Sequence, residues 1–367
     1  MAGQYLGVVE EAARGTDPGS GYAFIPVSGK LQPSFTPTDE SRKEFRGADT
    51  ALGDTSVVRR ESLWTFDLEC SWYPGDPIIG MLFKHLLGEA ASRATVDTSA
   101  KRGIIYPVAN GYAGAADQVN KGIGIIPNTD EAGTTKSQYF GGGRVTKCVI
   151  KAEGTADVKL TFTLQGPGEY IGAVDQTELD STPAFSTPTT PLVSSDILCY
   201  VGGSPTRTGT APNYTALAPN TAAAWRPDSI EITITNGLAD KVVMNGILGP
   251  SLTTREAQFM CEITAPTDYD DPASGFSSAD EFKTLFSGVR TNNIMIVANH
   301  ASDAGATPGA APYGVVIDIP SVMVTADPPE RNVEGKTPSI NFKFKTLYNT
   351  TTLYPIALLT TDKNAAY

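Results

Sequence analysis

The chain has 367 residues, enough to bury a sizeable core and long for one average domain. Its formal net charge of −12 argues against tight nucleic-acid binding, because such binders gather Lys and Arg against phosphates. The 36 glycines and 26 prolines are typical of folds with many turns between short strands. Neither a signal peptide nor a run of about 18 apolar residues is visible, so we expect no secretion signal and no membrane-spanning helix.

Four cysteines lie far apart, at Cys70, Cys148, Cys199 and Cys261. Zinc sites need closely spaced ligand pairs, and the chain has no CxxC pair and few histidines. Three of the cysteines, all except Cys199, lie in apolar or alternating runs. We therefore predict buried thiols, formed in a reducing cytoplasm, over the alternatives of disulfides or a metal site.

Strict alternation of apolar and polar residues recurs along the chain. From Leu63 to Trp72 the even positions are apolar, and the odd positions after Leu63 are polar. The same pattern marks Val158–Leu164, Ile230–Ile234, Phe259–Ile263 and Ile340–Phe344. Alternation indicates strands with one buried face, which is typical of antiparallel rather than parallel sheets. We predict a mainly β fold.

Two helices are predicted to flank the strands. Asp76 caps the first, with Pro77 at its first helical position. Ser278 begins the second, with Glu281 completing a capping box. The apolar faces comprise Ile79, Leu82, Phe83, Leu86 and Leu87 in the first helix, and Phe282, Leu285 and Phe286 in the second; Gly88 and Gly288 end them. We expect each helix to cover a sheet face or an edge.

Two segments interrupt the strand pattern. Residues 171–226 are rich in Thr, Pro, Ala and Gly, and there only Leu192–Val201 predicts a strand. We interpret 171–226 as an insertion, a loop or a small lobe, and 1–170 together with 227–367 as one β domain. The stretch from Ala91 to Lys136 is expected to be irregular, and loops of this length usually serve a function.

The chain offers few groups for catalysis. His85 falls near the end of the first helix, where we expect a partly exposed imidazole stabilised by the helix dipole. His300 stands with Ser302 and Asp303 in one short segment, whereas catalytic triads are assembled from separate elements. There is no GxSxG, Walker A, HExxH or GxGxxG motif. We predict no catalytic residues and a protein that is not an enzyme.

Two patterns approach an ion-binding motif without matching it. The run Gly141–Gly143 and Arg144 leads into a strand and not into a helix, so a turn is favoured over an anion-binding loop. Asp268, Asp270 and Asp271 lack the central glycine and the final glutamate of a calcium loop. We therefore predict no cofactor and no metal site.

The three tryptophans offer a sugar-stacking platform as an alternative to core packing. Trp64 and Trp72 share the apolar face of one predicted strand, and Trp225 lies in the insertion. Because a shared apolar face is normally buried, the core interpretation is favoured.

Read in order, the segments resemble the major tail tube proteins of long-tailed, siphovirus-like bacteriophages. The resemblance rests on the residues and motifs Glu10-Glu11-Ala12-Ala13-Arg14-Gly15-Thr16, Tyr22–Val27, Arg59–Trp64, Pro74–Pro77 with its helix to Gly88, Gly142-Gly143-Arg144, the second helix, Gly314–Ile319 with Pro320, Asp327-Pro328-Pro329 and Ile340–Leu359. It covers about two thirds of the chain, and the insertion departs from it.

The resemblance implies an antiparallel β-sandwich or barrel of the tail tube type, with one or two flanking helices. Six copies would close into a ring, and rings would stack into the conduit for DNA during ejection into the host. The implied partners are the chain itself, the tape-measure protein and the tail tip and terminator proteins, with no membrane. DNA would pass through the lumen without specific binding. The implied location is the virion tail, with assembly in the host cytoplasm.

The acidic balance has a use in such a tube. A negative lumen repels phosphates and lets DNA slide, whereas a basic lumen would hold it. Asp67, Glu69 and Glu231 lie on polar strand faces that are candidates for this lining. Simple solubility is the alternative explanation of the charge.

Three other functions stay open at this point. A virion surface or adhesion domain that binds a carbohydrate or receptor would need an exposed aromatic cluster. A tube-forming secretion component is usually a shorter chain. An enzyme would need a perturbed titrating pair in a cleft.

Overall fold

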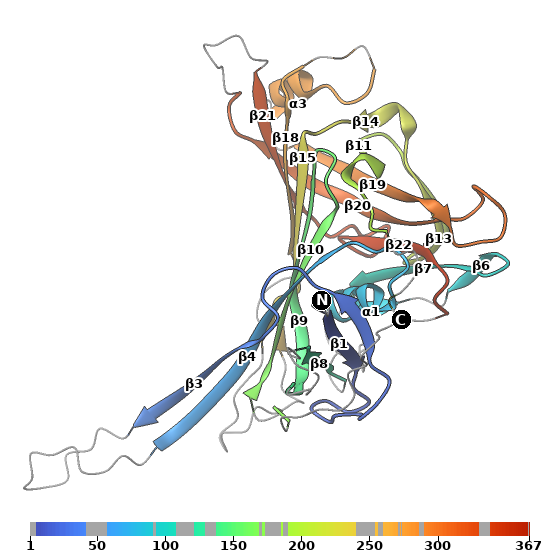
Figure 1. Ribbon diagram of the computed structural model, residues 1–367. Coiled ribbons are helices and arrows are strands. Elements are labelled where there is room, and N and C mark those ends of the chain that lie inside the picture. The colour runs from blue at the N-terminus through green and yellow to red at the C-terminus, as the bar shows by residue number, and fades with distance from the viewer. Residues whose placement is uncertain are drawn as a thin grey trace, which may run out of the picture.

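The fold is mainly β and antiparallel, as the alternating pattern predicted (Figure 1). The computed structural model describes residues 5–41, 57–90, 93–107, 121–128, 137–168, 171–172, 185, 190–239, 254–255, 260–270, 272, 274–285, 290–329, 338–365 and 367. Within these residues the structure has two α-helices, α1 (Pro77–Leu87) and α3 (Ser278–Leu285). No helix in this part of the chain has the length and apolar character needed to cross a bilayer.

The first layer is a sheet built largely from the strands that alternation predicted. In spatial order it comprises β3 (Ser34–Ser41), β4 (Val57–Ser71), β10 (Lys159–Pro167), β9 (Phe140–Glu153), β15 (Ser229–Thr235), β18 (Met260–Asp268) and β21 (Ser339–Thr346). The apolar set of each strand from β4 to β21 faces the core, and the polar set faces solvent. Phe259 and Asp271 lie outside the described residues.

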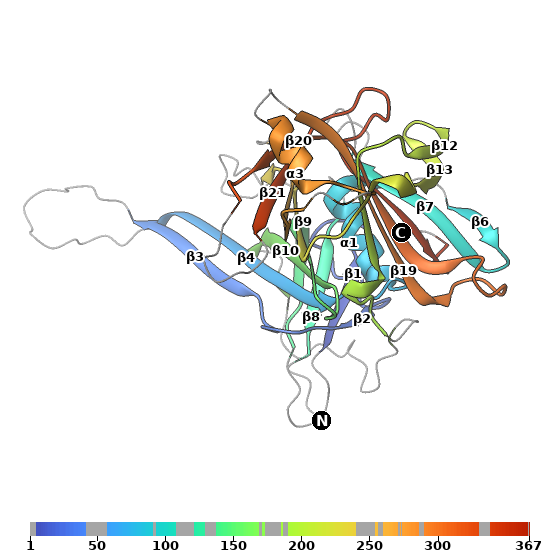
Figure 2. The same ribbon diagram turned by 90° about the horizontal axis from the view of Figure 1, so that it is seen from above.

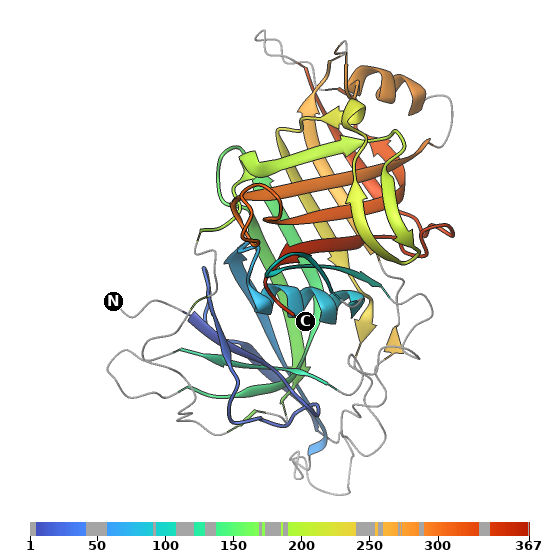
Figure 3. The ribbon, with the colours of Figure 1, turned by 90° about the vertical axis from the view of Figure 1, so that its right-hand side faces the viewer.

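The second layer packs across the first. It comprises β14 (Ala224–Trp225), β11 (Ile197–Val201), β19 (Arg290–Asp303), β20 (Pro312–Ala326), β22 (Ala357–Asp362), β7 (Ala100–Pro107), β5 (Gly88–Ala90) and β6 (Ala94–Asp97). Figure 3 shows these strands, in yellow-green, orange, red and teal, crossing in front of the first layer. Buried side chains from both layers form one continuous core, so the architecture is a β-sandwich.

Strand β20 connects the two layers. Its first half pairs with β22 of the second layer, and its second half pairs with β21 of the first. The register against β19 shifts between Ile319 and Val322, where Pro320 and Ser321 oppose the single residue Asn293. Proline lacks the N–H that a regular ladder requires, so it is suited to such a bulge. The bulge lets one strand bend from one sheet into the other.

A smaller sheet and α1 close the lower end of the sandwich. The small sheet joins β2 (Ala23–Pro26), β1 (Tyr5–Glu10) and β8 (Ile123–Pro127) to the first residues of β9. Helix α1 begins as predicted, because the Asp76 carboxylate accepts the Ile78 N–H at 2.8 Å and Pro77 follows it. Gly88 ends the helix at a φ of 121°. The Phe83 ring packs edge-on against Phe162 of β10, which places α1 on the inner face of the first layer.

In its described residues, the segment predicted as an insertion supplies four strands. Strand β11 lies within the predicted Leu192–Val201 and pairs with β19 inside the second layer. The hairpin of β12 (Thr206–Thr210) and β13 (Asn213–Ala218) packs its Tyr214 and Leu217 on the outer face of that layer. The stretch from Ala91 to Lys136, expected to be irregular, contains β6, β7 and β8. The boundary between domain and insertion stays a prediction.

A buried ion pair fastens this hairpin. The Arg207 guanidinium donates from Nε to Asp318 Oδ2 at 2.7 Å and from Nη2 to Oδ1 at 2.8 Å. The Tyr354 hydroxyl donates to Asp318 Oδ2 at 2.7 Å. The Asp318 side chain is fully buried, so its charge depends on these donors.

We predict that Asp318→Asn lowers the free energy of unfolding by about 3–5 kcal/mol, because Arg207 loses its counter-charge in a dry site. The matched control is Glu231→Gln, which breaks the Lys151–Glu231 pair of 2.8 Å on the solvent face. Both of its side chains are well exposed, so the expected loss is below about 1 kcal/mol. Equal losses in a denaturant titration would contradict the assignment.

Candidate functional site

The β3–β4 hairpin extends away from the body as an arm (Figures 1 and 2). Strand β3 pairs with β4 from Ser34↔Thr65 to Ser41↔Val57. Strand β4 pairs with β10 only from Leu63 onward, so its residues 57–62 have β3 as their one neighbour among the described strands. Both outer edges of this arm therefore present backbone groups without a strand partner in the described part of the chain. Such edges are templates for pairing with another chain.

Trp64 anchors the arm where it leaves the body. Its side chain is fully buried, and its indole N–H donates to the Gly141 carbonyl at 3.0 Å. The ring lies against Gly143 and Gly166, where an added Cβ would stand 2.7 and 2.5 Å from it. Because real Cβ contacts are never this close, both positions require glycine.

A buried carboxylate lies on the other side of the same glycine run. Glu11 is fully buried and accepts hydrogen bonds from the Gly142 N–H at 2.9 Å, the Gly15 N–H at 2.6 Å and the Tyr139 hydroxyl. Arg14 Nε donates to the Gly142 carbonyl at 3.0 Å. Burial raises the pKa of Glu11, and these hydrogen bonds act in the opposite direction.

The glycine run therefore binds a carboxyl group through the Gly142 N–H, but one supplied by the chain itself. The prediction of a turn at Gly141–Gly143 is wrong, because these residues lie within β9. Gly142 adopts a φ of 67°, which is the left-handed region that favours glycine. We call Glu11, Trp64, Tyr139 and Gly141–Gly143 the arm-root junction. The sequence signal was the adjacent Glu10-Glu11 pair after the apolar run Tyr5–Val9.

His85 is a structural residue and not an exposed one as expected. Its side chain is 4% exposed, and its Nε2 lies 3.0 Å from Glu10 Oε1. Lys84 and Lys121 approach the same carboxylate at 3.6 and 3.2 Å. The hydrogen bond from His85, together with the lysine charges, lowers the pKa of Glu10 to about 2. The cluster ties β1 to the end of α1.

His300 does not form a catalytic triad. Its Nδ1 accepts the Ser302 backbone N–H at 3.0 Å, and its Nε2 lies 3.0 Å from the Thr190 hydroxyl. Asp303 instead accepts the Gly309 N–H at 2.8 Å through Oδ2. Neither the serine hydroxyl nor the aspartate thus contacts the imidazole. All three residues lie at the end of β19, and His300 links this end to Thr190.

The aspartate segment before α3 is also structural. The Ser278 hydroxyl accepts the Asp270 N–H at 2.8 Å and donates to the Asp268 carbonyl at 2.8 Å. Helix α3 begins at Ser278 as predicted, but its cap is Ser277, whose hydroxyl accepts the Asp280 N–H at 3.1 Å, so the predicted capping box from Ser278 is wrong. No group of three His, Cys, Asp or Glu side chains in the described residues is arranged to hold a metal. Phe286 and Gly288 lie outside those residues.

The tryptophans and cysteines all lie in the core. Trp64, Trp72 and Trp225 are at most 5% exposed, so none offers a face for a sugar. All four cysteines are buried and free. Burial raises the pKa of every thiol, that of Cys199 to about 12.

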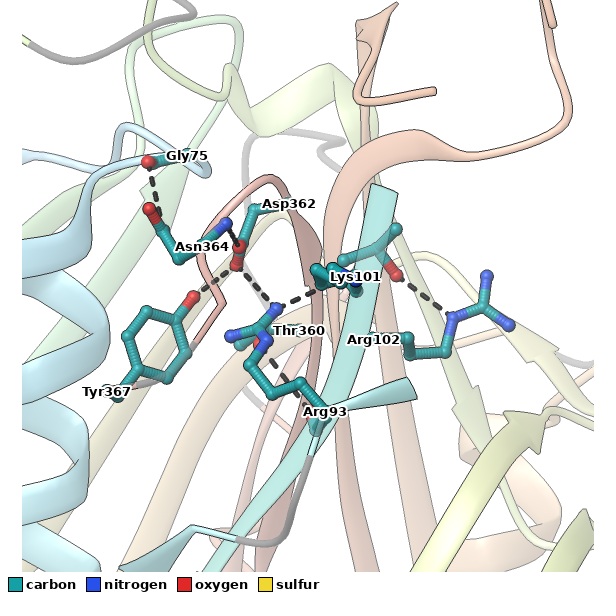
Figure 4. A network of polar contacts seen from close by, with 10 residues as sticks. Gly75, Arg93, Lys101, Arg102, Thr360, Asp362, Asn364 and Tyr367 are labelled. Atoms are coloured by element: carbon teal, nitrogen blue, oxygen red, sulfur yellow. Dashed lines mark hydrogen bonds and ion pairs between the residues drawn. The ribbon is translucent and has the colours of Figure 1, made fainter. Parts of the chain in front are cut away.

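A second buried network fixes the last described residues (Figure 4). Arg93 Nη2 donates to Asp362 Oδ2 at 2.9 Å and to the Lys101 carbonyl at 3.2 Å. The guanidinium lies 4.4 Å from the centre of the Tyr367 ring, and the Tyr367 hydroxyl donates to the same carboxylate. Asn364 reaches the Gly75 carbonyl at 3.3 Å, so the network joins β22 to the segment before α1.

Two surface hollows lie at the edges of the second layer. One of about 220 Å³ lies beside β11 and β14 and is lined by Leu198, Trp225 and Asp228 among others. The other, of about 440 Å³, lies between β19 and α3 and is lined by Asn220, Asn292 and other groups. Neither hollow contains His85 or His300, so neither brings a candidate base to a cleft.

No family model matches the chain, and no curated protein matches it in sequence. The arm, the arm-root junction and the charged surface are therefore the features that indicate a function.

We predict that Glu10→Gln destabilises the protein in a pH-dependent way. A folded-state pKa of about 2, below the ordinary value of 4.5, contributes stability above about pH 4.5 that is lost as pH falls toward 2. Because solvent screens this partly exposed carboxylate, the variant should lose about 1–2 kcal/mol at neutral pH and little near pH 2. Denaturant unfolding across pH measures this. The exposed Glu262→Gln should change stability little throughout, and a pH-independent loss in Glu10→Gln would refute the assignment.

We predict that the four native thiols resist aromatic disulfide reagents near pH 8 until the protein unfolds. The reason is that burial excludes the reagent and raises the pKa of each thiol, so little thiolate forms. The thiol released per chain, measured by absorbance, should rise from near zero to all four in denaturant. Thr65→Cys on the exposed face of β4 provides a positive control that should react at once.

Proposed function

We propose that this protein is a structural virion protein, the tail tube subunit of a long-tailed phage. In this proposal six copies close into a ring, and rings stack into the conduit through which DNA is ejected into the host. The observation that carries the proposal is the β3–β4 arm, a two-stranded extension of an antiparallel sandwich.

The arm is suited to a partner outside its own chain. A two-stranded ribbon by itself is marginally stable in water, and beyond Leu63 no third strand in the described part of the chain pairs with it. Globular proteins usually shorten, cover or charge such edges. A long ribbon is useful when it packs against a neighbouring molecule, and a second copy of the chain is always present during self-assembly. A repeated head-to-tail contact of this kind builds rings or filaments.

The described side chains support a structural role. The imidazoles of His85 and His300 are each held by neighbouring protein groups, and the triad residue types near His300 do not converge. The buried charges of Asp318 and Asp362 are paired with arginines. In these networks the titratable side chains bind other protein groups. A scaffold that assembles through the arm is therefore the function we favour.

The solvent face of the first layer suits a passage for DNA. Its charged residues include both signs and comprise Asp67, Glu69, Glu153, Glu231, Glu262 and Asp268 with Lys147, Lys151, Lys159, Lys343 and Lys345. Three of these lysines are paired with carboxylates, Lys151 with Glu231, Lys159 with Asp157 and Lys343 with Asp327. A face without a basic stripe does not gather phosphates, and the net charge of −12 acts in the same direction. We propose that DNA slides past such a surface without specific binding.

The adhesion alternative loses its main support. The tryptophans that would form a sugar platform are buried, and the exposed aromatics Phe35, Phe185 and Tyr348 come from separate elements. Tape-measure, tail tip and terminator proteins stay proposed partners, and the virion tail stays the proposed location.

Negative-stain electron microscopy with light scattering tests the proposal. We predict that the intact chain forms six-fold rings or hollow tubes with a regular axial repeat, because each arm packs on a neighbouring copy. A variant in which residues 37–62 are replaced by Asn-Gly should stay a folded monomer. The replacement joins the paired residues Thr36 and Leu63 by a two-residue hairpin turn.

The matched control shortens a different hairpin. The paired residues Ala239 and Thr254 of β16 (Leu238–Ala239) and β17 (Thr254–Arg255) are joined in the same way by Asn-Gly in place of residues 240–253. This control should still assemble. A strict dimer or trimer that binds a carbohydrate would overturn the proposal, and so would an armless variant that forms the same tubes.

A further inference from the structure

The arm leaves the body at one residue pair. The ladder between β4 and β10 ends at Leu63↔Pro167, and beyond it β4 continues with β3 alone among the described strands. Trp64, one position inside this limit, is fully buried. Its contacts therefore determine how the arm is attached.

The partner of Trp64 is a bulge in β9. Ile123 of β8 pairs with Gly143, and Ile125 pairs with Phe140, so two glycines of β9 oppose the single residue Gly124. Gly141 and Gly142 are these two residues. The Gly141 carbonyl accepts the Trp64 indole N–H, and the Gly142 N–H donates to Glu11. One bulge thus contacts the arm root on one side and β1 on the other.

The bulge is held in place by Glu11. A bulge leaves backbone groups unpaired by the ladder, and here the Glu11 carboxylate and Arg14 Nε take both the N–H and the carbonyl of Gly142. Gly15 and Tyr139 donate to the same carboxylate and fix its position. Glu11 comes directly after β1, whose residues pair with β2 and β8. The carboxylate therefore connects the small sheet to the arm.

We propose that Glu11 is a positioning residue that sets the direction of the β3–β4 arm, acting through the Gly141–Gly142 bulge on Trp64. When the carboxylate is lost, the bulge relaxes, the Trp64 hydrogen bond is lost, and the arm swings relative to the body. Because the inference concerns a single chain, it stands or falls independently of the assembly proposed above.

Pulsed electron paramagnetic resonance between two spin labels tests this coupling. One label is placed by Thr38→Cys on β3 and the other by Thr325→Cys, an exposed position of β20 in the body. The native thiols are buried and stay unlabelled. The doubly labelled protein is mixed with an excess of unlabelled chain, so that only the distance within one chain is recorded. The parent protein should then give one narrow distance. Glu11→Gln and Trp64→Phe should each lose that distance and give a broad distribution, while the circular dichroism of the body is retained.

The control is Glu262→Gln, which neutralises an exposed carboxylate of β18 and should keep the narrow distance. A distribution that stays narrow in Glu11→Gln overturns the proposal. A broad distribution in Trp64→Phe together with a narrow one in Glu11→Gln has the same meaning, because Trp64 would then position the arm without Glu11. If Glu11→Gln does not fold, Tyr139→Phe decides by the same two outcomes. It removes one donor from the Glu11 carboxylate and keeps the ring.

Discussion

The close approach of the Trp64 indole to the backbone of β9 is the contact on which the rest of the architecture depends. Strand β9 pairs with β8 at its start and with β10 and β15 along its length, so it belongs to two sheets at once. Gly143 in β9 and Gly166 in β10 let the Trp64 ring lie in contact with both backbones. A side chain at Gly143 would separate β4 from β9 and open the core where the arm begins.

Three buried polar centres then join segments that lie far apart in the chain. Glu11 joins β1 to β9, Asp318 joins β20 to the β12–β13 hairpin, and Asp362 joins β22 to the residue before β6. Each carboxylate is buried with several donors directed at it. Such centres add little net stability compared with apolar packing, but a misplaced strand would leave a charge unpaired. These centres therefore help to select the native strand register and the native packing of the segments that they join.

The molecule consists of a compact body and an extended arm. The body is a crossed sandwich with a continuous core and a solvent face of mixed charge. The arm is a ribbon whose edges are available to another molecule. In the proposed tube this division is useful, because a stiff body keeps the shape of each ring while the arm reaches the next copy.

The sequence alone determined the elements whose pattern is local. Period-two alternation identified β4, β10, β15, β18 and β21, because side chains on a strand alternate between two faces. The pair Asp76-Pro77 located the start of α1, since a cap acts on N–H groups two residues away. The dispersed cysteines in apolar runs predicted buried thiols for the same local reason.

Tertiary structure alone decided the features that depend on distant residues. The arm was missed because residues 57–62 do not alternate, and their strand exists through pairing with β3. His85 is buried because Glu10, 75 positions away in the sequence, supplies its partner. The role of Glu11 depends on Tyr139 and Gly142, more than 120 positions away. A sequence pattern reports which face of an element is apolar, but which carboxylate meets which donor is fixed only when the sheets pack.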